Sequence, residues 1–215
     1  QTPPLLLKSG IFHPKANVNE QTVDSITLNA ARGDEKIFLY IQFIQTPGAG
    51  ERKILSAAGI ELLNYLPKNT YLAAVHNRLS LQVLKSAKAV SIFQLSPVQK
   101  MHPALASGNI PQWAQKVNGM VDVWATFPKT FSFEQVENLL QQKNISVIDQ
   151  QYASYQVIGF RVPKKRLFEV ASFSFLEYLE PVPHPDQPLN FNSQAYSAAR
   201  ALTAGTGLGG KALDG

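Results

Sequence analysis

Four histidines are the first residues to consider for chemistry, because an imidazole can serve as a catalytic base or as a metal ligand. His13, His76, His102 and His184 fall in expected turns or loops, and no two of them have the spacing of a metal-binding pair. The chain has no cysteine, no Gly-x-Ser-x-Gly element and no paired aspartates. Disulfides and thiolate metal sites are therefore excluded, and we expect neither a metal nor another cofactor.

Two acidic residues, Asp122 and Glu137, are the best placed for acid–base chemistry in the second half of the chain. Asp122 falls on the polar side of an expected strand, and Glu137 falls on an expected helix. Nothing in their spacing pairs them, and general acid–base catalysis needs positioned partners. The sequence therefore predicts no catalytic site built from this chain alone.

The glycine-rich stretch Gly205–Lys211 has a superficial similarity to a phosphate-binding loop. Ala212 follows the lysine, where such a loop has serine or threonine, and no strand is expected before the stretch. Its composition predicts a flexible connector instead.

The elements that would position any site are clearest between Met120 and Pro183. Apolar residues alternate with polar ones from Val121 onward, which is typical of a strand. Ser132 lies three residues before Gln135, the spacing of a capping box, and indicates the start of a helix. The other expected elements are strands at Ile145–Ile148, Tyr155–Val162 and Phe175–Leu179 and a helix carrying Leu167, Val170 and Ala171.

The same order of elements is expected upstream, between Lys36 and Met101. Gly59-Ile60 and Asn144-Ile145 occupy matching points, and 144 − 59 gives an offset of 85 residues, which indicates an internal duplication. The expected elements are a strand at Ile37–Phe43, a helix at Glu51–Ala58, strands at Ile60–Leu66 and Tyr71–Val75, a helix capped by Ser80, and a strand at Val90–Leu95.

The repeated β-α-β-β-α-β order is that of ferredoxin-like folds. The prediction is an α+β chain with two tandem ferredoxin-like modules, antiparallel sheets, an extended N-terminal arm and a C-terminal linker. The arm contains an expected strand at Val23–Leu28, and either adds an edge strand to a sheet or lies across a partner. The expected boundaries are 1–35 for the arm, 36–103 for the first module, 104–119 for a connector, 120–185 for the second module and 186–215 for the linker.

Composition narrows the possible partners. The net charge is +5, but the lysines and arginines are scattered and the densest run is only Lys164–Arg166, so nucleic acid is not expected as a partner. No run of 18 apolar residues exists, so no membrane partner is expected. The chain begins without methionine, which suggests a removed leader and a secreted origin.

Three stretches carry a resemblance to a known family: Leu6–Gly10 with Phe12 and Pro14, Leu39–Phe43, and Gly59–Tyr71. Together they resemble the N-terminal pro-region of secreted subtilisin-like serine proteases. The closing stretch, Gly205–Gly215, is similar to the glycine-rich segment that leads into the catalytic domain of that family. The first catalytic aspartate comes shortly after this point in the family, so Asp214 is not assigned that role. Residues 186–215 would then include the start of a truncated catalytic domain.

The resemblance implies an inhibitor and folding chaperone that is not itself an enzyme, in a parent protein that is a serine endopeptidase. The implied partner is the cognate subtilisin-like catalytic domain, and the implied location is secreted, periplasmic or cell-surface. A protease cleft binds peptide as an extended strand, so the proline-rich segment of Glu180, Pro181, Val182, Pro183, His184 and Pro185 is expected to enter it. Cleavage is expected after Leu189.

Two other functions stay open from the sequence. A secreted binding or adhesion module with no attached protease would present an interface through Tyr40, Tyr71, Trp124 and Tyr155. A regulatory pair of modules would hold a small molecule between them, although only Pro47–Gly50 has the composition expected of a ligand-binding turn.

Overall fold

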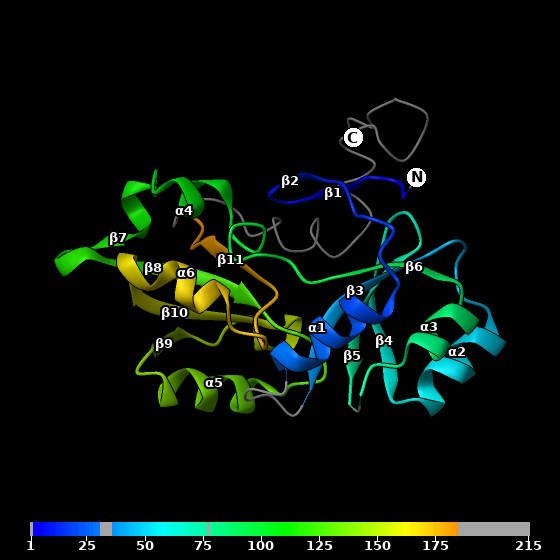
Figure 1. Cartoon of the computed structure of the whole chain (residues 1–215). Helices are drawn as coiled ribbons and strands as arrows, with labels where there is room; N and C mark the ends of the chain where they lie inside the picture. The colour runs from blue at the N-terminus through cyan, green and yellow to red at the C-terminus, as the bar shows by residue number, and fades with distance from the viewer. Residues whose placement is uncertain (1, 31–35, 77, 185–215) are drawn as a thin grey trace, which may run out of the picture. The chain divides into compact units, whose positions relative to one another are not determined.

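The computed structural model describes residues 2–30, 36–76 and 78–184. Gln1–Val182 form one compact unit, and Pro183–Gly215 form a second, of which only Pro183 and His184 are described. The compact unit is α+β, and the strands of both its larger sheets pair antiparallel, as the sequence predicts (Figure 1).

The first sheet has the strand order β4-β5-β3-β6. Its four strands and the two helices between them follow one another as strand, helix, strand, strand, helix, strand. This is the order of elements that the sequence predicts. The bounds are β3 Ile37–Phe43, α2 Ala49–Ala57, β4 Ile60–Leu66, β5 Thr70–Val75, α3 Leu81–Ser86 and β6 Ala89–Phe93.

Local signals fix the ends of the two helices in this half. Glu51 Oε2 accepts the Gly48 N–H at 3.2 Å at the start of α2, and Ser80 caps α3 by accepting the Val83 N–H at 3.4 Å. Gly59, which ends the α2 turn, has φ 76°, a backbone conformation that favours glycine.

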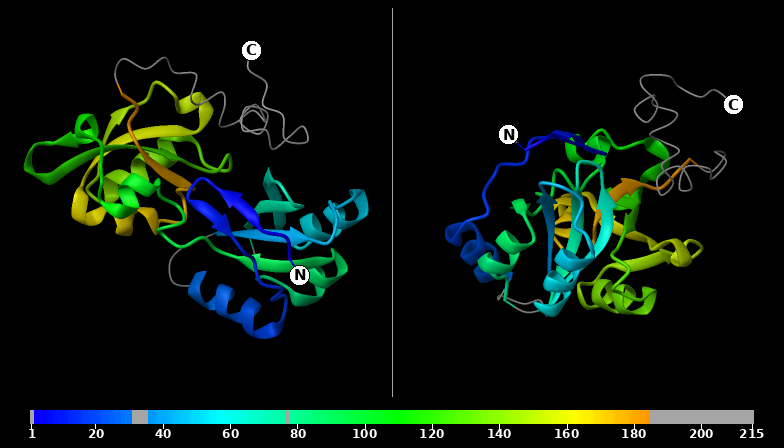
Figure 2. Two further views of the ribbon diagram at one scale, coloured as in Figure 1. Left: turned by 90° about the horizontal axis from the view of Figure 1, so that it is seen from above. Right: turned by 90° about the vertical axis from the view of Figure 1, so that its right-hand side faces the viewer.

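Within the expected arm, the described residues 2–30 are not an extended arm. β1 (Leu5–Leu7) and β2 (Gly10–Phe12) form a hairpin around a turn at Lys8-Ser9, and α1 (Glu20–Ala30) follows. The hairpin packs on the first sheet through Phe12, whose ring lies 4.8 Å from that of Phe93. Figure 2 shows this hairpin, in blue, between the strands of the first sheet and β11.

The expected strand at Val23–Leu28 is wrong, because these residues belong to the helix α1. Asn19 caps its first turn by accepting the Thr22 N–H at 2.9 Å. Val23 and Ile26, one helical turn apart, enter the core of the first sheet. Because Val23 and Ile26 are three residues apart, a helix places both side chains on the face that packs against the first sheet. This burial favours a helix over the strand that the alternating residues predict.

The second sheet has the strand order β11-β8-β10-β9, and the short strand β7 also pairs with β8. The expected capping box is confirmed, because Ser132 and Gln135 bond reciprocally at the start of α5. The last strand lies later than expected, because Phe175 and Leu176 pack in the core ahead of it. The bounds are β7 Gln115–Lys116, β8 Met120–Thr126, α5 Phe133–Gln142, β9 Ser146–Asp149, β10 Val157–Pro163, α6 Leu167–Ala171 and β11 Tyr178–Pro181.

The residues between the two sheets complete the core of the second half. α4 (Pro103–Ser107) and the short 3-10 helix η1 (Gln112–Ala114) contribute Leu105 and Ala114 to it. Asn144, at the point that matches Gly59, has φ 54°. The two halves therefore share their order of elements, their strand order and a positive-φ residue at the same turn.

The helical state of α1 is tested by a pair of substitutions, because a strand would place Ile26 and Leu28 on one face. Ile26 is 8% exposed and Leu28 is 68% exposed. Ile26→Ala is expected to lower the free energy of unfolding by about 2–4 kcal/mol. Leu28→Ala is expected to change it by about 0.5 kcal/mol or less. Equal losses in urea unfolding would contradict the helix.

Candidate functional site

The residues expected to enter a protease cleft divide between the two units of the chain. Glu180 and Pro181 end β11, and Val182 is the last residue of the compact unit. Pro183 and His184 begin the second unit. Pro185 and the expected cleavage position, Leu189, lie outside the described residues.

β11 is bonded along one edge by a full strand and on the other edge at Leu179. On one side it pairs antiparallel with β8 along its whole length. On the other side, the Leu179 N–H donates to the Lys100 carbonyl at 2.7 Å, and the Leu179 carbonyl accepts the His102 N–H at 2.8 Å. Extended residues with both edges satisfied are held firmly in a sheet.

The residues on either side of the β11 end are also fixed. The Val182 N–H donates to the Asp122 carbonyl at 3.3 Å, and the Val182 carbonyl accepts the Trp113 Nε1–H at 2.9 Å. The Glu180 carboxylate lies 3.6 Å from the Lys8 ammonium. Residues 180–182 are therefore part of this sheet, and the first residue beyond the compact unit is Pro183.

The face of the second sheet turned away from α5 and α6 is here called the open face. The pairing of β8 with β10, β9 and β11 places Asp122, Trp124, Asp149, Arg161 and Glu180 on it. Ile148 lies at the register shift between β9 and β10, next to Val147, which faces the core. Ile148 is 44% exposed, and the Arg161 side chain is 42% exposed. Asp122 and Trp124 are each only 6% exposed, so Ile148 and Arg161 are the groups that this face offers to a partner.

A bidentate ion pair organises the charges on the open face. Arg161 donates to both oxygens of Asp122, at 2.6 and 2.9 Å, and Lys116 lies 3.7 Å from the same carboxylate. The hydrogen bonds that Arg161 donates to Asp122 raise the pKa of the guanidinium. Asp122 is thus the anionic partner of Arg161 and Lys116. The structure does not bring it together with Glu137, the other acidic candidate, which lies on α5.

An aromatic pair continues the open face beside these charges. The ring of Trp124 lies 4.9 Å from that of Tyr152. Gly159 lies beneath the indole, where a Cβ atom would meet Trp124 Cδ1 at 3.3 Å and Asp149 Cβ at 2.6 Å. Only glycine lets the strand approach so closely.

The corresponding face of the first sheet is closed. Phe38, Leu72 and Ala74 are buried on it, and Phe131 from the second half packs against them. The Phe38 and Phe131 rings are 5.5 Å apart. The first sheet therefore offers no equivalent free face at this position.

The four aromatic residues expected to form an adhesion surface do not do so. Tyr71 is 7% exposed and Trp124 is 6% exposed, and Tyr40 is half-buried. Only Tyr155, at 59% exposure, is open to a partner. Such a surface through all four residues is not supported.

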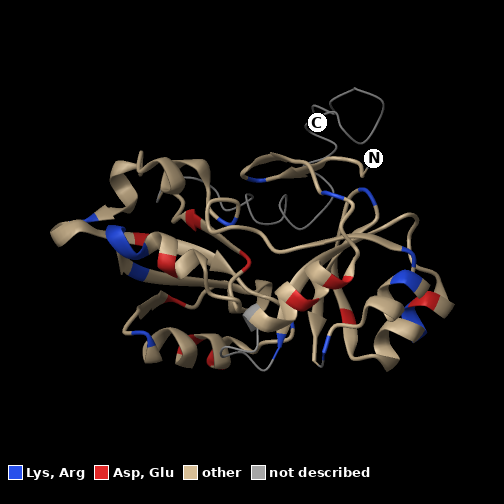
Figure 3. Ribbon diagram, viewed as in Figure 1, with Lys and Arg blue, Asp and Glu red and all other residues tan. Residues whose placement is uncertain are grey.

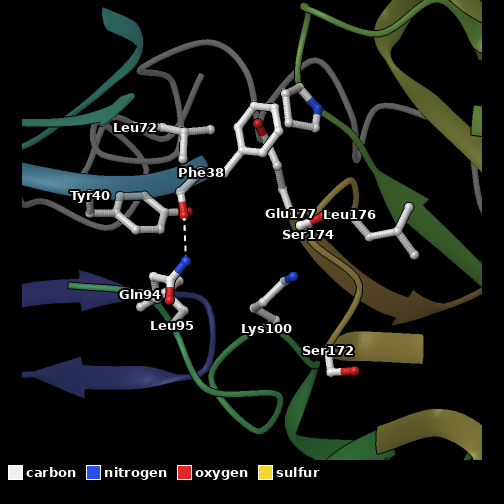
Figure 4. Close-up of a pocket in the computed structure, with 11 residues that line it drawn as sticks. Phe38, Tyr40, Leu72, Gln94, Leu95, Lys100, Ser172, Ser174, Leu176 and Glu177 are labelled. Carbon is white, nitrogen blue, oxygen red and sulfur yellow. Dashed lines mark hydrogen bonds between the residues drawn. The ribbon is translucent and has the colours of Figure 1, made fainter. Parts of the chain in front are cut away.

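A pocket of about 150 Å³ lies between the closed face of the first sheet and the loop before β11 (Figure 4). Its polar groups come from distant parts of the chain: Tyr40 on β3, Lys100 before α4, and Ser174 and Glu177 before β11. The other lining residues are Phe38, Leu72, Gln94, Leu95, Pro128, Ser172 and Leu176.

The ionisable groups of this pocket are strongly perturbed. Burial raises the pKa of Glu177 to about 7, although the charges of Lys100, Lys129 and Lys8 offset part of the rise. Burial lowers the pKa of Lys100 to about 8, and Glu177 offsets part of that fall. Burial also raises the pKa of Tyr40, which keeps its proton at neutral pH.

Sequence reasoning missed Lys100 and Glu177 as functional candidates. The available signal was Glu177 itself, a carboxylate inside the apolar run Phe175–Leu179. A charge in such a run is buried or faces a polar pocket. Its partner across the pocket, Lys100, has no sequence signal that separates it from other lysines.

Charges elsewhere are dispersed. Lysines and arginines alternate with acidic residues over both halves of the described chain (Figure 3). Among the described residues, no group of three histidines and carboxylates is arranged to hold a metal ion. None of the helices in the described ranges is long and apolar enough to cross a bilayer.

Comparison with known proteins identifies one family model. Residues 6–96 match a domain of unknown function, DUF8729. The match runs from β1 through α1 and the first sheet, and α1 and that sheet share one hydrophobic core. No curated protein and no solved structure matches the chain.

The raised pKa of Glu177 predicts a pH-dependent stability. In the folded chain the carboxyl keeps its proton up to about pH 7, whereas its ordinary pKa is 4.5, so stability falls as pH rises between these values. Glu177→Gln keeps an acceptor for Asn64, which donates to the carboxylate at 3.3 Å, and removes the charge. It is expected to raise the free energy of unfolding by about 1–2 kcal/mol at pH 8 and to change it little at pH 4.

The control for this prediction is Glu134→Gln, at an exposed position of α5. Urea unfolding of both variants at the two pH values gives the comparison. A gain for Glu177→Gln of the same size at pH 4 and pH 8 would show that the carboxyl is ionised normally.

Proposed function

We propose that this chain is the pro-region of a subtilisin-like serine protease, which inhibits the catalytic domain and assists its folding without being an enzyme itself. The observation that carries the proposal is the fixed strand β11, which ends at the boundary of the compact unit and is followed at once by a proline-rich segment. A rigid sheet would thus hold an extended peptide ready for a protease cleft.

The strand order supports a finer description of the fold. We assign both halves to the ferredoxin-like type, since each has the β-α-β-β-α-β order and the pairing order second-third-first-fourth. The ferredoxin-like type agrees with the sequence resemblance to subtilase pro-regions, which usually have one copy of this fold, whereas a second copy departs from that pattern.

The second half is the better candidate for contact with the protease. Its open face exposes Ile148 and Arg161, whereas Phe131 covers the matching face of the first sheet. The open face also adjoins β11, so one surface of the partner would meet both the sheet and the segment that follows it.

The cleft-binding segment is best taken to start at Pro183. Glu180 and Pro181 are paired with β8, and Val182 is bonded at both its N–H and its carbonyl. From Pro183 to a cleavage point after Leu189, an extended chain would reach roughly 20 Å. That length is enough to lie along a substrate cleft as a strand.

Preorganisation gives this arrangement its affinity. Fixing the backbone of one residue costs about 1–2 kcal/mol. The bonds of β11 remove that cost only for the residues up to Val182, and the prolines from Pro183 onward lower it for the segment that enters the cleft, because each fixes its own φ angle. Binding to the native catalytic domain but not to its unfolded form stabilises the native form by mass action. Inhibition and chaperone activity would then follow from one interaction.

The test compares chain 1–215 with a chain that ends at Val182, the last residue of the compact unit. Both are titrated against the catalytic domain expected downstream of Gly215, with subtilisin as a general probe. Chain 1–215 is expected to inhibit at about 1 µM or below, and the shorter chain about 100-fold less strongly with an unchanged melting temperature.

Surface variants separate the contribution of the open face. Arg161→Ala is expected to weaken inhibition, whereas Lys53→Ala, at an exposed position of α2, is not. Absence of inhibition by chain 1–215 at micromolar concentration, together with no effect on refolding of the catalytic domain, would rule out the proposed function.

A further inference from the structure

We propose that the pocket between the two halves binds a small zwitterionic amino acid of the size of glycine or alanine. Lys100 would hold the carboxylate with help from the Tyr40 hydroxyl, and Glu177 would hold the ammonium with help from Ser174. This inference goes beyond the proposed function and does not rest on it.

The first argument is that opposite charges line the pocket without pairing. No ion pair joins Lys100 to Glu177 within the described residues. Among the described residues, Lys100 Nζ donates only to the Phe173 carbonyl, at 2.7 Å, and Glu177 accepts a side-chain hydrogen bond only from Asn64. An ammonium has three donors and a carboxylate about four acceptor sites, so both groups keep capacity for a ligand.

Two hydroxyls add to this capacity. Those of Tyr40 and Ser174 both line the pocket, and neither makes a hydrogen bond to another described residue. Figure 4 shows the Lys100 side chain running toward the loop that carries Ser174. Donors and acceptors for both ends of a zwitterion therefore border one cavity.

The perturbed pKa values point in the same direction. The pKa of Lys100 is lowered and that of Glu177 is raised, mainly by burial. These are the shifts expected of charges that lack a close counter-ion. A bound zwitterion would supply one counter-charge to each group and favour the ionised form of both.

The size of the pocket limits the ligand. A cavity of about 150 Å³ holds a molecule with roughly six non-hydrogen atoms, such as benzene in an apolar example. Nucleotides and drug-sized molecules need about 300–1,000 Å³. The apolar side chains of Phe38, Leu72 and Leu176 leave room for a hydrogen or a methyl group as the side chain of the ligand.

The ligand would act as a link between the two halves. Tyr40 belongs to the first sheet, whereas Ser174 and Glu177 belong to the loop before β11. Because the site exists only when these parts are packed together, binding stabilises that packing.

Isothermal titration of chain 1–215 with glycine and with alanine tests the proposal. Saturable binding with a Kd of about 10 µM–1 mM is expected for at least one of them. The melting temperature should rise by about 5 °C at a 100-fold excess over Kd. Acetate and methylamine, which carry one charge each, and tryptophan, which is too large, serve as ligand controls.

Variants assign the binding to this pocket. Lys100→Met and Glu177→Gln are each expected to weaken binding about tenfold or more, and Tyr40→Phe and Ser174→Ala less strongly. Lys53→Met and Glu134→Gln, both at exposed helix positions, are the matched controls and should leave the Kd unchanged.

Two results would overturn the proposal even if the charge variants failed to fold. The first is the absence of saturable binding of either amino acid to the unmodified chain up to about 10 mM. The second is binding of acetate as tight as that of the amino acids, which would make the pocket an anion site.

Discussion

The two-sided bonding of β11 is the constraint on which the second half of the molecule depends. β8 holds one edge of the strand, and Lys100 and His102 hold the other through Leu179. This arrangement fixes the backbone as far as Val182, which is also bonded at both of its backbone groups.

The same constraint brings the pocket residues together. The bond from Leu179 to Lys100 places the lysine beside the loop that carries Glu177. The two charges are desolvated by the closed face of the first sheet, where Tyr40 lies. Burying charges without close partners costs stability, and proteins retain such groups most often where a ligand or a partner uses them. The packing of the two halves and the chemistry between them are thus parts of one arrangement.

Much of the fold could be predicted from local patterns. The alternation after Val121, the capping box at Ser132 and the matching turns at Gly59 and Asn144 are short-range signals that tertiary packing reinforces. The α1 helix was not predicted, because the preference of this segment for a helix depends on contacts of Val23 and Ile26 with a sheet whose residues come later in the sequence. The pocket was missed for a similar reason. The residues next to Lys100 and Glu177 in the sequence do not indicate which distant residues these two side chains will face in the folded chain.

The most direct test of the central claim is the structure of chain 1–215 bound to a subtilisin-like catalytic domain. The account predicts that β11 stays paired with β8, that the open face of the second sheet covers the enzyme surface, and that the chain from Pro183 onward lies extended in the substrate cleft. A complex in which the cleft is empty, or in which β11 has left β8 to enter it, would contradict the account.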